Sequence, residues 1–512
     1  MRTESADFAC WHWQRWSFDG SDREVIERIL HELMTLFELS PTDGRLTIRL
    51  EEMCSKPITV RTGLKSDGED FCWRVAQGKE DELDRAAVHR LFKLHLYEML
   101  REKFALKAAP WGILHGVRPT KIAHRWLDNG ADGAAVIQRL RDDYGASGAK
   151  AKLLTEVALR QRPFLAKVSP RVIGVYVGIP FCLSRCLYCS FPAYVLPPKE
   201  QLKKFMKVFR RDLRAAGATV RELGFEVESI YIGGGTPTAL PDVLFAETMT
   251  LIRENFGGNN LREFTVEAGR PDSMSAAKIA AMKKNGVTRV SVNPQTMQKA
   301  TLALIGRAHT PEDILTMYAN LRAEGGWAIN MDVILGLPGE THQDVADTMQ
   351  KIIALAPDDI TLHALALKKG SRLKLALDEK SQSRAELSSP SGIIALPDDD
   401  EMRRMSDVAL KLVGEAGFRP YYLYRQGYMR GQLENIGCAK AGAESVYNIQ
   451  IMEERQTILG VGCAAVTKVV DPVSHRLKSS FNPKDFIIYQ RDIDFYVGRR
   501  AKLLREVYGG DR

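Results

Sequence analysis

A regular alternation of short apolar runs and amphipathic segments, beginning near residue 170, constrains the fold of this chain more than any other feature. Each run is rich in β-branched residues, and helical patterns such as KKFMKVFRRDLRAAG and SAAKIAAMKKNG lie between the runs. Strands that alternate with helices form βα units and build a parallel sheet. The six predicted strands are residues 172–178, 227–234, 262–269, 287–294, 327–336 and 359–367. Six units are fewer than the eight of a closed barrel, so we expect an α/β fold with an open or partial barrel.

The most distinctive motifs stand at the carboxyl ends of these predicted strands. A cysteine-rich segment follows the first strand, GGGTPT (233–238) ends the second, and GLPGET comes shortly after the fifth. Ligands of open α/β sheets and barrels bind at the carboxyl ends of the strands. We therefore expect one large site, to which the other strands contribute Glu267, Gln295, Asp332 and Ala366.

The alternation also divides the chain into parts. Before it, β-branched runs at 44–52, 57–64 and 69–77 and a helical pattern at 80–104 predict a separate α+β unit, to which the sequence assigns no role. After it, a polar stretch broken by Pro and Gly has the composition of a linker. The predicted parts are an N-terminal α+β domain (1–165), a βα core (166–377), a loop or linker (378–402) and a smaller C-terminal region (403–512).

Composition limits the environment of the protein. No apolar run approaches the roughly 18 residues of a membrane span, and the N-terminus lacks the apolar region of a secretory signal. We therefore expect a cytoplasmic protein, whose thiols stay reduced. The net charge of +8 is spread along the chain. It indicates solubility in the first place, and it is also compatible with an anionic partner such as a nucleic acid or a polycarboxylate.

Three of the eight cysteines lie close together, as Cys182, Cys186 and Cys189 in a C-x3-C-x2-C pattern with Tyr188 before the last. Clustered cysteines in a cytoplasmic protein indicate a metal-binding or catalytic site rather than disulfides. Structural zinc takes four ligands in paired sets, and no second set is present. A [4Fe–4S] cluster is normally held by four thiolates, so three leave one iron open to a small molecule.

With these motifs the chain resembles the radical S-adenosylmethionine (SAM) superfamily. In that superfamily the amino group and carboxylate of SAM bind the fourth iron, and one electron splits SAM into methionine and a 5′-deoxyadenosyl radical. The motifs YVGIPFC, YIGGGTPT, VEAGRPD, SVNPQTM, NMDVILGLPGET and LGVGCAA resemble, in order and spacing, the oxygen-independent coproporphyrinogen III oxidase family and its long HemZ-type branch. The resemblance covers roughly residues 172–470.

The resemblance implies a role for each matching position. Cys182, Cys186 and Cys189 hold the cluster, and Tyr176 and Tyr188 shelter it. The remaining positions contact SAM, and some members of the family bind a second SAM molecule. These positions are Gly234, Gly235 and Thr236 at the methionine end, Glu267 at a polar end, Gln295, Arg307, Asp332 and Ala366, and the apolar Val466.

The implied activity is anaerobic oxidative decarboxylation of coproporphyrinogen III to protoporphyrinogen IX in haem biosynthesis. It requires a low-potential electron donor and an electron acceptor, and it implies neither a membrane nor a nucleic acid as partner. Two positions depart from the best-studied oxidases, because Gly178 replaces a histidine and Phe191 replaces a cysteine. A haem chaperone that keeps the cluster and the SAM site is therefore a second hypothesis. A radical SAM enzyme that modifies tRNA is a third, favoured by net charge alone.

Overall fold

The computed structural model forms two compact units, Met1–Glu156 and Val157–Arg512. It describes residues 11–16, 23–37, 46–53, 59–66, 70–77, 85–116, 118–166, 169–368, 370–382, 388–389, 392–393, 395–426 and 430–509. Among these residues, no helix is both long and apolar enough to cross a bilayer.

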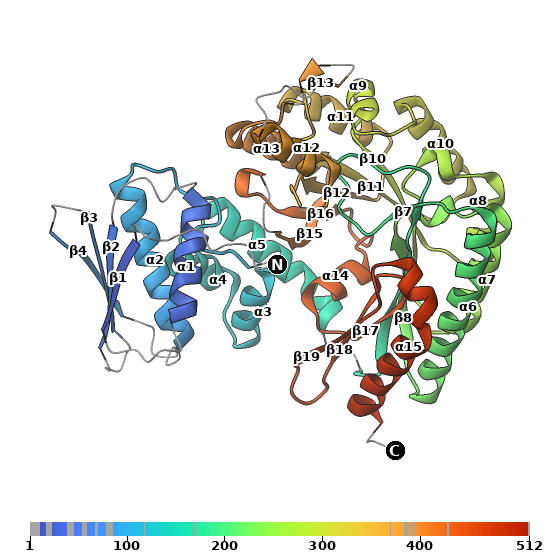
Figure 1. The fold of residues 1–512 in the computed structure, drawn as a ribbon, viewed down its shortest axis with the longest axis horizontal. Coiled ribbons are helices and arrows are strands. Elements are labelled where there is room, and N and C mark those ends of the chain that lie inside the picture. The colour runs from blue at the N-terminus through green and yellow to red at the C-terminus, as the bar shows by residue number, and fades with distance from the viewer. Residues whose placement is uncertain are drawn as a thin grey trace. The chain divides into compact units, whose positions relative to one another are not determined.

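The first unit is built on a four-stranded sheet in the order β1-β2-β3-β4 (Figure 1). The three predicted strands are confirmed as β2 (Leu46–Met53), β3 (Thr59–Ser66) and β4 (Cys72–Gln77), which pair antiparallel. A strand that the sequence did not predict, β1 (Trp11–Trp16), adds to β2 in parallel. The helices are α1 (Arg23–Phe37), α2 (Arg85–Lys103), α3 (Thr120–Asp128), α4 (Gly133–Tyr144) and α5 (Gly148–Leu165).

The second unit contains the six predicted parallel strands, side by side in sequence order. They are β5 (Val172–Ile179), β8 (Glu226–Gly234), β9 (Glu263–Glu267), β10 (Arg289–Gln295), β11 (Ala328–Leu335) and β12 (Asp359–Ala364). The connecting helices form an arc on the outer side of these strands (Figure 1): α6 (Lys199–Glu222), α7 (Asp242–Phe256), α8 (Ala276–Lys284), α9 (Lys299–Leu304), α10 (Pro311–Glu324) and α11 (His342–Ala354). This architecture is the expected partial (β/α)6 barrel.

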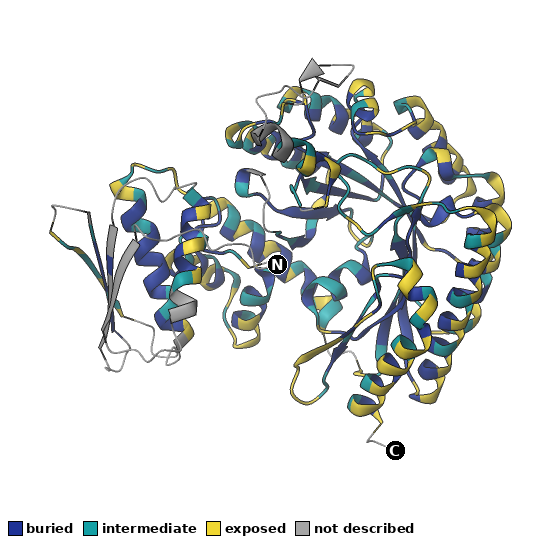
Figure 2. Cartoon of the chain, in the orientation of Figure 1, coloured by how far each residue is buried: buried dark blue, intermediate teal, exposed yellow. Residues whose placement is uncertain are grey.

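Burial explains why these segments fold as strands and helices. The strands are buried along most of their length, whereas the outer sides of α6, α7 and α8 are exposed (Figure 2). A strand that is buried on both faces has apolar residues at nearly every position, which explains the apolar runs in the sequence. Two threonines mark the starts of helices. Thr310 and Thr341 form capping boxes at the N-termini of α10 and α11. An N-cap of this kind contributes about 1 kcal/mol to a helix.

The C-terminal region extends the same sheet at both edges. The strands β15 (Arg419–Tyr424) and β16 (Asn435–Ala439) continue it antiparallel beyond β12. At the other edge, β17 (Ile458–Gly462) pairs with β5 in parallel, and β18 (Val466–Val470) and β19 (Leu477–Phe481) follow antiparallel. The sheet therefore has eleven strands, in the order β15-β16-β12-β11-β10-β9-β8-β5-β17-β18-β19.

The remaining helices and short strands surround this sheet. They are α12 (Arg372–Gln382), α13 (Asp399–Glu415), α14 (Val446–Glu453), α15 (Phe486–Tyr508) and the two-residue strands β6 (Phe181–Cys182), β7 (Tyr194–Val195), β13 (Ser388–Ser389) and β14 (Gly392–Ile393). The predicted linker 378–402 falls partly outside the described residues. Within them, α12 and α13 overlap its two ends.

Candidate functional site

A cavity of about 540 Å³ lies at the carboxyl ends of the parallel strands. It brings together residues from all six strands or the loops after them, and residues from the C-terminal region. The predicted site residues on its wall are Tyr176, Cys182, Cys186, Tyr188, Cys189, Gly234, Gly235, Thr236, Glu267, Gln295, Arg307, Asp332 and Ala366. Val466 lies apart from them, on a second cavity of about 240 Å³ that shares Tyr176 and Gly234 with the first.

The three cysteines of the C-x3-C-x2-C pattern are half-buried free thiols on the wall of the main cavity. Cys182 ends the short strand β6, where it accepts a hydrogen bond from the Thr236 hydroxyl at 3.4 Å. The loop that carries the other two is tied to the barrel, because Leu187 N–H donates to the Ile305 carbonyl at 2.9 Å. Burial raises the pKa of the thiols of Cys182 and Cys189.

The glycines at the end of β8 are required by close contacts within the protein. A Cβ at Gly233 would lie 2.8 Å from the Glu267 carboxylate carbon, and one at Gly235 would lie 2.6 Å from the Phe181 carbonyl oxygen. Gly234 has a φ of +112°, which side chains other than glycine rarely adopt. These glycines therefore allow β8 to pack against β6 and against Glu267, in addition to any access that they give a ligand.

Glu267 ends β9 and is held by the neighbouring strand. Its Oε1 accepts a hydrogen bond of 2.7 Å from the hydroxyl of Tyr231. Burial raises the pKa of Glu267 to about 7, against the lowering effect of the Tyr231 hydrogen bond, and nearby Asp332 raises it as well. The carboxylate is thus close to its titration point at neutral pH.

Gln295 has a strained backbone at the end of β10. Its φ is +68°, and the pairing of β10 with β11 shifts register between Val292 and Gln295. The side chain is 6% exposed, and its Oε1 has no hydrogen-bond partner among the described residues. Strain and an unsatisfied buried acceptor are both unfavourable in the free protein, and such features gather at ligand sites.

Arg307 is buried beside the cysteine loop. Its guanidinium donates to the Asn293 carbonyl and to the Tyr188 hydroxyl at 3.2 Å. Only Nε lacks a hydrogen-bond partner within the described part of the chain. The open fork that a carboxylate would need is therefore partly occupied, and the arginine also orients Tyr188.

Asp332 lies within β11 and joins a polar chain across the barrel interior. Asn330 donates to its Oδ1 at 2.7 Å, and Thr361 donates to Asn330 at 3.0 Å. The Nε2 atom of His363 lies 3.7 Å from its other carboxylate oxygen. Asp332 is thus held on one side and open to the cavity on the other.

Comparison with known proteins places this site in a family. Residues 176–352 match the family described as the Radical SAM superfamily. The oxygen-independent coproporphyrinogen-III oxidase-like protein HemZ of Bacillus subtilis (strain 168) is 36% identical over 406 residues, which are 78% of this chain and 77% of that protein. This chain belongs to the HemZ-type family of radical SAM proteins.

Other relatives of this HemZ-type protein carry a different name. The heme chaperone HemW of the same Bacillus subtilis strain is 26% identical over 311 residues, 59% of this chain and 74% of that protein. The solved structure of coproporphyrinogen III oxidase HemN from Escherichia coli matches with a TM-score of 0.51 at 21% identity, over 66% of this chain and 73% of that chain. This last likeness confirms the fold.

The cofactors of a radical SAM protein are a [4Fe–4S] cluster and SAM, and the described residues of this HemZ-type chain fit them. No three His, Cys, Asp or Glu side chains in the described residues are arranged to bind a single metal ion. A cluster needs a wider arrangement, since each cysteine binds a different iron. Three thiols around one cavity, beside an unsatisfied amide oxygen of Gln295 and a free Nε of Arg307, suit a cluster and a polar ligand.

Helix α14 supplies a cavity wall that the sequence did not predict for this HemZ-type chain. Its residues Tyr447, Asn448, Ile451 and Met452 line the cavity. Glu263 fixes its N-terminus, because the carboxylate accepts from the Ser445 hydroxyl at 2.8 Å and from the Val446 N–H at 2.7 Å.

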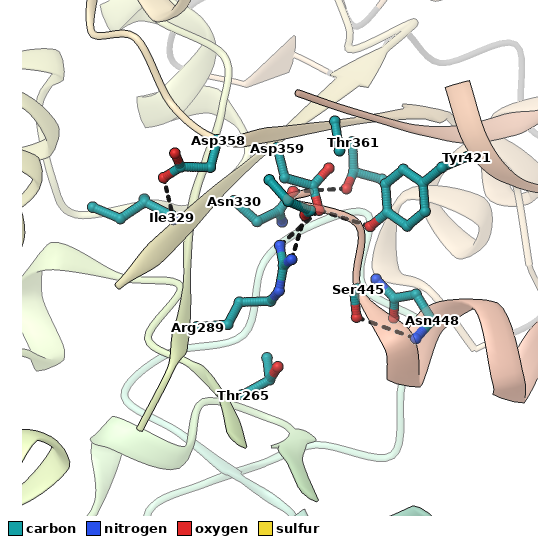
Figure 3. Close-up of polar contacts among 12 residues, drawn as sticks. Thr265, Arg289, Ile329, Asn330, Asp358, Asp359, Thr361, Tyr421, Ser445 and Asn448 are labelled. Carbon is teal, nitrogen blue, oxygen red and sulfur yellow. Dashed lines mark hydrogen bonds and ion pairs between the residues drawn. The ribbon is translucent and has the colours of Figure 1, made fainter. Parts of the chain in front are cut away.

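A buried ion pair fixes the neighbouring strand β15. Arg289 donates to Asp359 at 3.0 Å, and the Tyr421 hydroxyl donates to the same carboxylate at 2.7 Å. Figure 3 shows Arg289 and Tyr421 converging on Asp359, near Ser445 at the start of α14. The C-terminal region is therefore anchored in the barrel interior.

Sequence reasoning also missed cavity residues that lie inside strands and loops. They are Tyr231 on β8, His363 on β12, Lys368 after β12 and Tyr422 and Tyr424 on β15. The signal for His363 was present, because Asp359, Thr361 and His363 alternate with apolar residues and so share one face of their strand. Polar residues on a strand expected to be buried on both faces indicate an interior site.

Proposed function

We propose that this chain is a radical SAM oxidoreductase that decarboxylates coproporphyrinogen III to protoporphyrinogen IX without oxygen. The observation that carries the proposal is the meeting of three cluster cysteines and the predicted SAM positions on one cavity, in a chain 36% identical to an oxidase-like protein. Two propionate side chains lose carbon dioxide and become vinyl groups. Each event also releases one electron, so a low-potential donor and an electron acceptor are required.

The proposed roles follow the cavity wall. Cys182, Cys186 and Cys189 hold the cluster. Tyr188 lies beside it and accepts a hydrogen bond from Arg307. The SAM contacts are Tyr176, Gly234, Gly235, Thr236, Glu267, Gln295, Arg307, Asp332, Ala366 and, from the second cavity, Val466. When bound, cluster and SAM together supply a 5′-deoxyadenosyl radical that abstracts a hydrogen atom from a propionate side chain. The residues of the chain orient both ligands and exclude water.

The cavity residues without a proposed cluster or SAM role suit a substrate that has both flat ring surfaces and negative charge. Tyr422 and Tyr424 present rings in a stacked arrangement, with centroids 6.5 Å apart. Lys368 lines the cavity, and its ammonium group makes no ion pair or hydrogen bond with the described residues. Burial lowers the pKa of this group. Coproporphyrinogen carries four carboxylates, for which this ammonium group is a suitable partner.

The test is an anaerobic reaction that contains the cluster-loaded protein, a reductant, SAM and coproporphyrinogen III. We expect 5′-deoxyadenosine and carbon dioxide to rise together when coproporphyrinogen is added, and vinyl products to accumulate. SAM cleavage that does not respond to coproporphyrinogen would refute the oxidase proposal. Omission of the reductant and the Cys189→Ala protein are the controls.

A haem chaperone is the second candidate, favoured by the HemW relatives. Gly178 is a departure from the familiar oxidases. A Cβ at Gly178 would lie 2.8 Å from the Cys463 carbonyl oxygen. The histidine of the familiar oxidases therefore has no room at this position. Tight, stoichiometric haem binding together with uncoupled SAM cleavage would support the chaperone. Nucleic-acid binding that falls steeply with salt would instead support a tRNA-modifying enzyme.

A further inference from the structure

Strand β8 holds the Glu267 carboxylate in a seat formed by Tyr231 and Gly233. The Tyr231 hydroxyl donates to Oε1 at 2.7 Å. Gly233 leaves open the space in which a Cβ would lie 2.8 Å from the carboxylate carbon. Tyr231 and Gly233 are two residues apart and therefore face the same side of the strand.

An aromatic stack restricts the movement of Tyr231. Its ring lies 4.5 Å from that of Tyr447 at an interplanar angle of 23°, and 6.2 Å from that of Tyr176 at 21°. Tyr447 comes from α14, so the C-terminal region completes this stack. The rings of Tyr176 and Tyr447 also lie 6.4 Å apart, so the three tyrosines pack against one another. A ring packed against two others keeps its hydroxyl directed at one acceptor.

The groups around Glu267 decide whether its carboxylate is ionised at neutral pH. Burial and Asp332 on β11 raise the pKa of Glu267, whereas Tyr231, the Gly234 N–H and His363 on β12 lower it, to a final value of about 7. The hydroxyls of Tyr176 on β5 and Tyr447 on α14 also face it, and burial raises the pKa of both. An ionised Glu267 accepts hydrogen bonds from an ammonium or hydroxyl group far better than a protonated one.

We infer that Tyr231 and Gly233 are positioning residues that hold Glu267 as the acceptor for a polar end of SAM. The inference rests on the proposed role of Glu267 in SAM binding. It gives the first glycine of the GGGTPT motif a function distinct from direct contact with a ligand, since Gly233 does not line the cavity.

The experiment measures SAM affinity by equilibrium dialysis across pH 5.5–9 on the anaerobic, cluster-loaded protein without any tetrapyrrole. Wild-type affinity should fall as pH drops below about 7, where Glu267 becomes protonated. Tyr231→Phe removes one donor to the carboxylate. We expect its pH midpoint to move up by about one unit and its affinity at pH 7 to fall roughly fivefold.

Two further variants separate position from folding. Gly233→Ala is allowed by the backbone, because the φ of Gly233 lies outside the left-handed region. The three atoms nearest to its Cβ would be the carboxylate atoms of Glu267, which must shift. We expect weaker SAM binding at every pH. Tyr318→Phe on α10 is the matched control, since it removes a tyrosine hydroxyl that is hydrogen-bonded to Arg322 and lies outside both cavities. Its pH midpoint should equal that of the wild type.

Three results would overturn the inference. One is a Tyr231→Phe protein with wild-type affinity and midpoint. Another is an equal shift in Tyr318→Phe, which would assign the effect to the loss of a tyrosine hydroxyl away from Glu267. A wild-type protein that binds no SAM would overturn it together with the role of Glu267. Because no tetrapyrrole is present, failure of the oxidase proposal has a separate readout, the absence of coupled decarboxylation.

Discussion

Replacing Gln295 by glycine and by alanine tests whether the site stores backbone strain. Gln295 has a φ of +68°, is 6% exposed and keeps a buried Oε1 without a partner among the described residues. Both substitutions remove the amide. Only glycine also relieves the left-handed backbone, so the difference between the two variants isolates the strain.

The expected magnitude follows from two opposing terms. A residue other than glycine in the left-handed region costs roughly 1–2 kcal/mol. Glycine costs about 0.5–1 kcal/mol in backbone entropy relative to alanine. We therefore expect the Gln295→Gly protein to be more stable than Gln295→Ala by about 1 kcal/mol. This order is the reverse of that in a helix, where alanine is better by about 1 kcal/mol.

The assay is thermal unfolding of both proteins without SAM, for which about 1 kcal/mol corresponds to a midpoint difference of about 1 °C in a chain of this length. The exposed Lys203 on α6 provides the matched control, because alanine should exceed glycine in stability there. In a second assay, both Gln295 variants should bind SAM about 3- to 10-fold more weakly than the wild type, the value of one hydrogen bond. The terminal amide torsion is soft, so the unsatisfied oxygen can turn to a ligand donor.

Two results would refute this reasoning. If Gln295→Ala is as stable as Gln295→Gly or more stable, the left-handed backbone is not strained in the protein. If both variants bind SAM as tightly as the wild type, the unsatisfied amide is not a SAM contact. The first result concerns the backbone and the second concerns the ligand, so either part can fail without the other.

Three further changes test the cluster, the fold and the substrate site. Cys189→Ala should lose the intact cluster, and full iron and sulfide content would contradict this. Arg500→Met leaves the fully buried Asp212 without its cationic partner and should lower the free energy of unfolding by about 3–5 kcal/mol. The exposed Arg505→Met should lower it far less, and equal losses would disprove the prediction. Lys368→Met should raise the KM for coproporphyrinogen and leave SAM affinity unchanged, and an unchanged KM would exclude Lys368 from substrate binding.

The barrel could be predicted from the sequence because its signals are local. Each of the six predicted apolar runs overlaps one of β5 and β8–β12, and the strands pair in sequence order. The pairing of β17 with β5 had no such signal, since it joins segments about 280 residues apart in the chain. It depends on a backbone contact between Gly178 and Gly462, where a Cβ on Gly462 would lie 2.2 Å from the Gly178 carbonyl oxygen.

The features of the candidate site also fall into those that the sequence could predict and those that it could not. Positions at strand ends, such as Glu267 and Gln295, could be found because strand order places them at one edge of the sheet. The strain at Gln295 and the occupied fork of Arg307 could not, because they arise from contacts between distant segments. Tyr447 was missed for the same reason. Contacts with distant residues such as Glu263 place α14 beside the cavity, and no sequence pattern indicates these contacts.

The buried polar network explains why the C-terminal region is part of the site and not an independent domain added to the barrel. Arg289 and Asp359 are charged groups inside the barrel, and Tyr421 on β15 and the Ala443 carbonyl supply further hydrogen bonds to them. Removing one partner of such a pair leaves an unpaired charge. These groups of the βα core therefore keep their hydrogen bonds only when residues beyond 403 are present. Through the stack on Tyr231, the same residues complete the seat of Glu267.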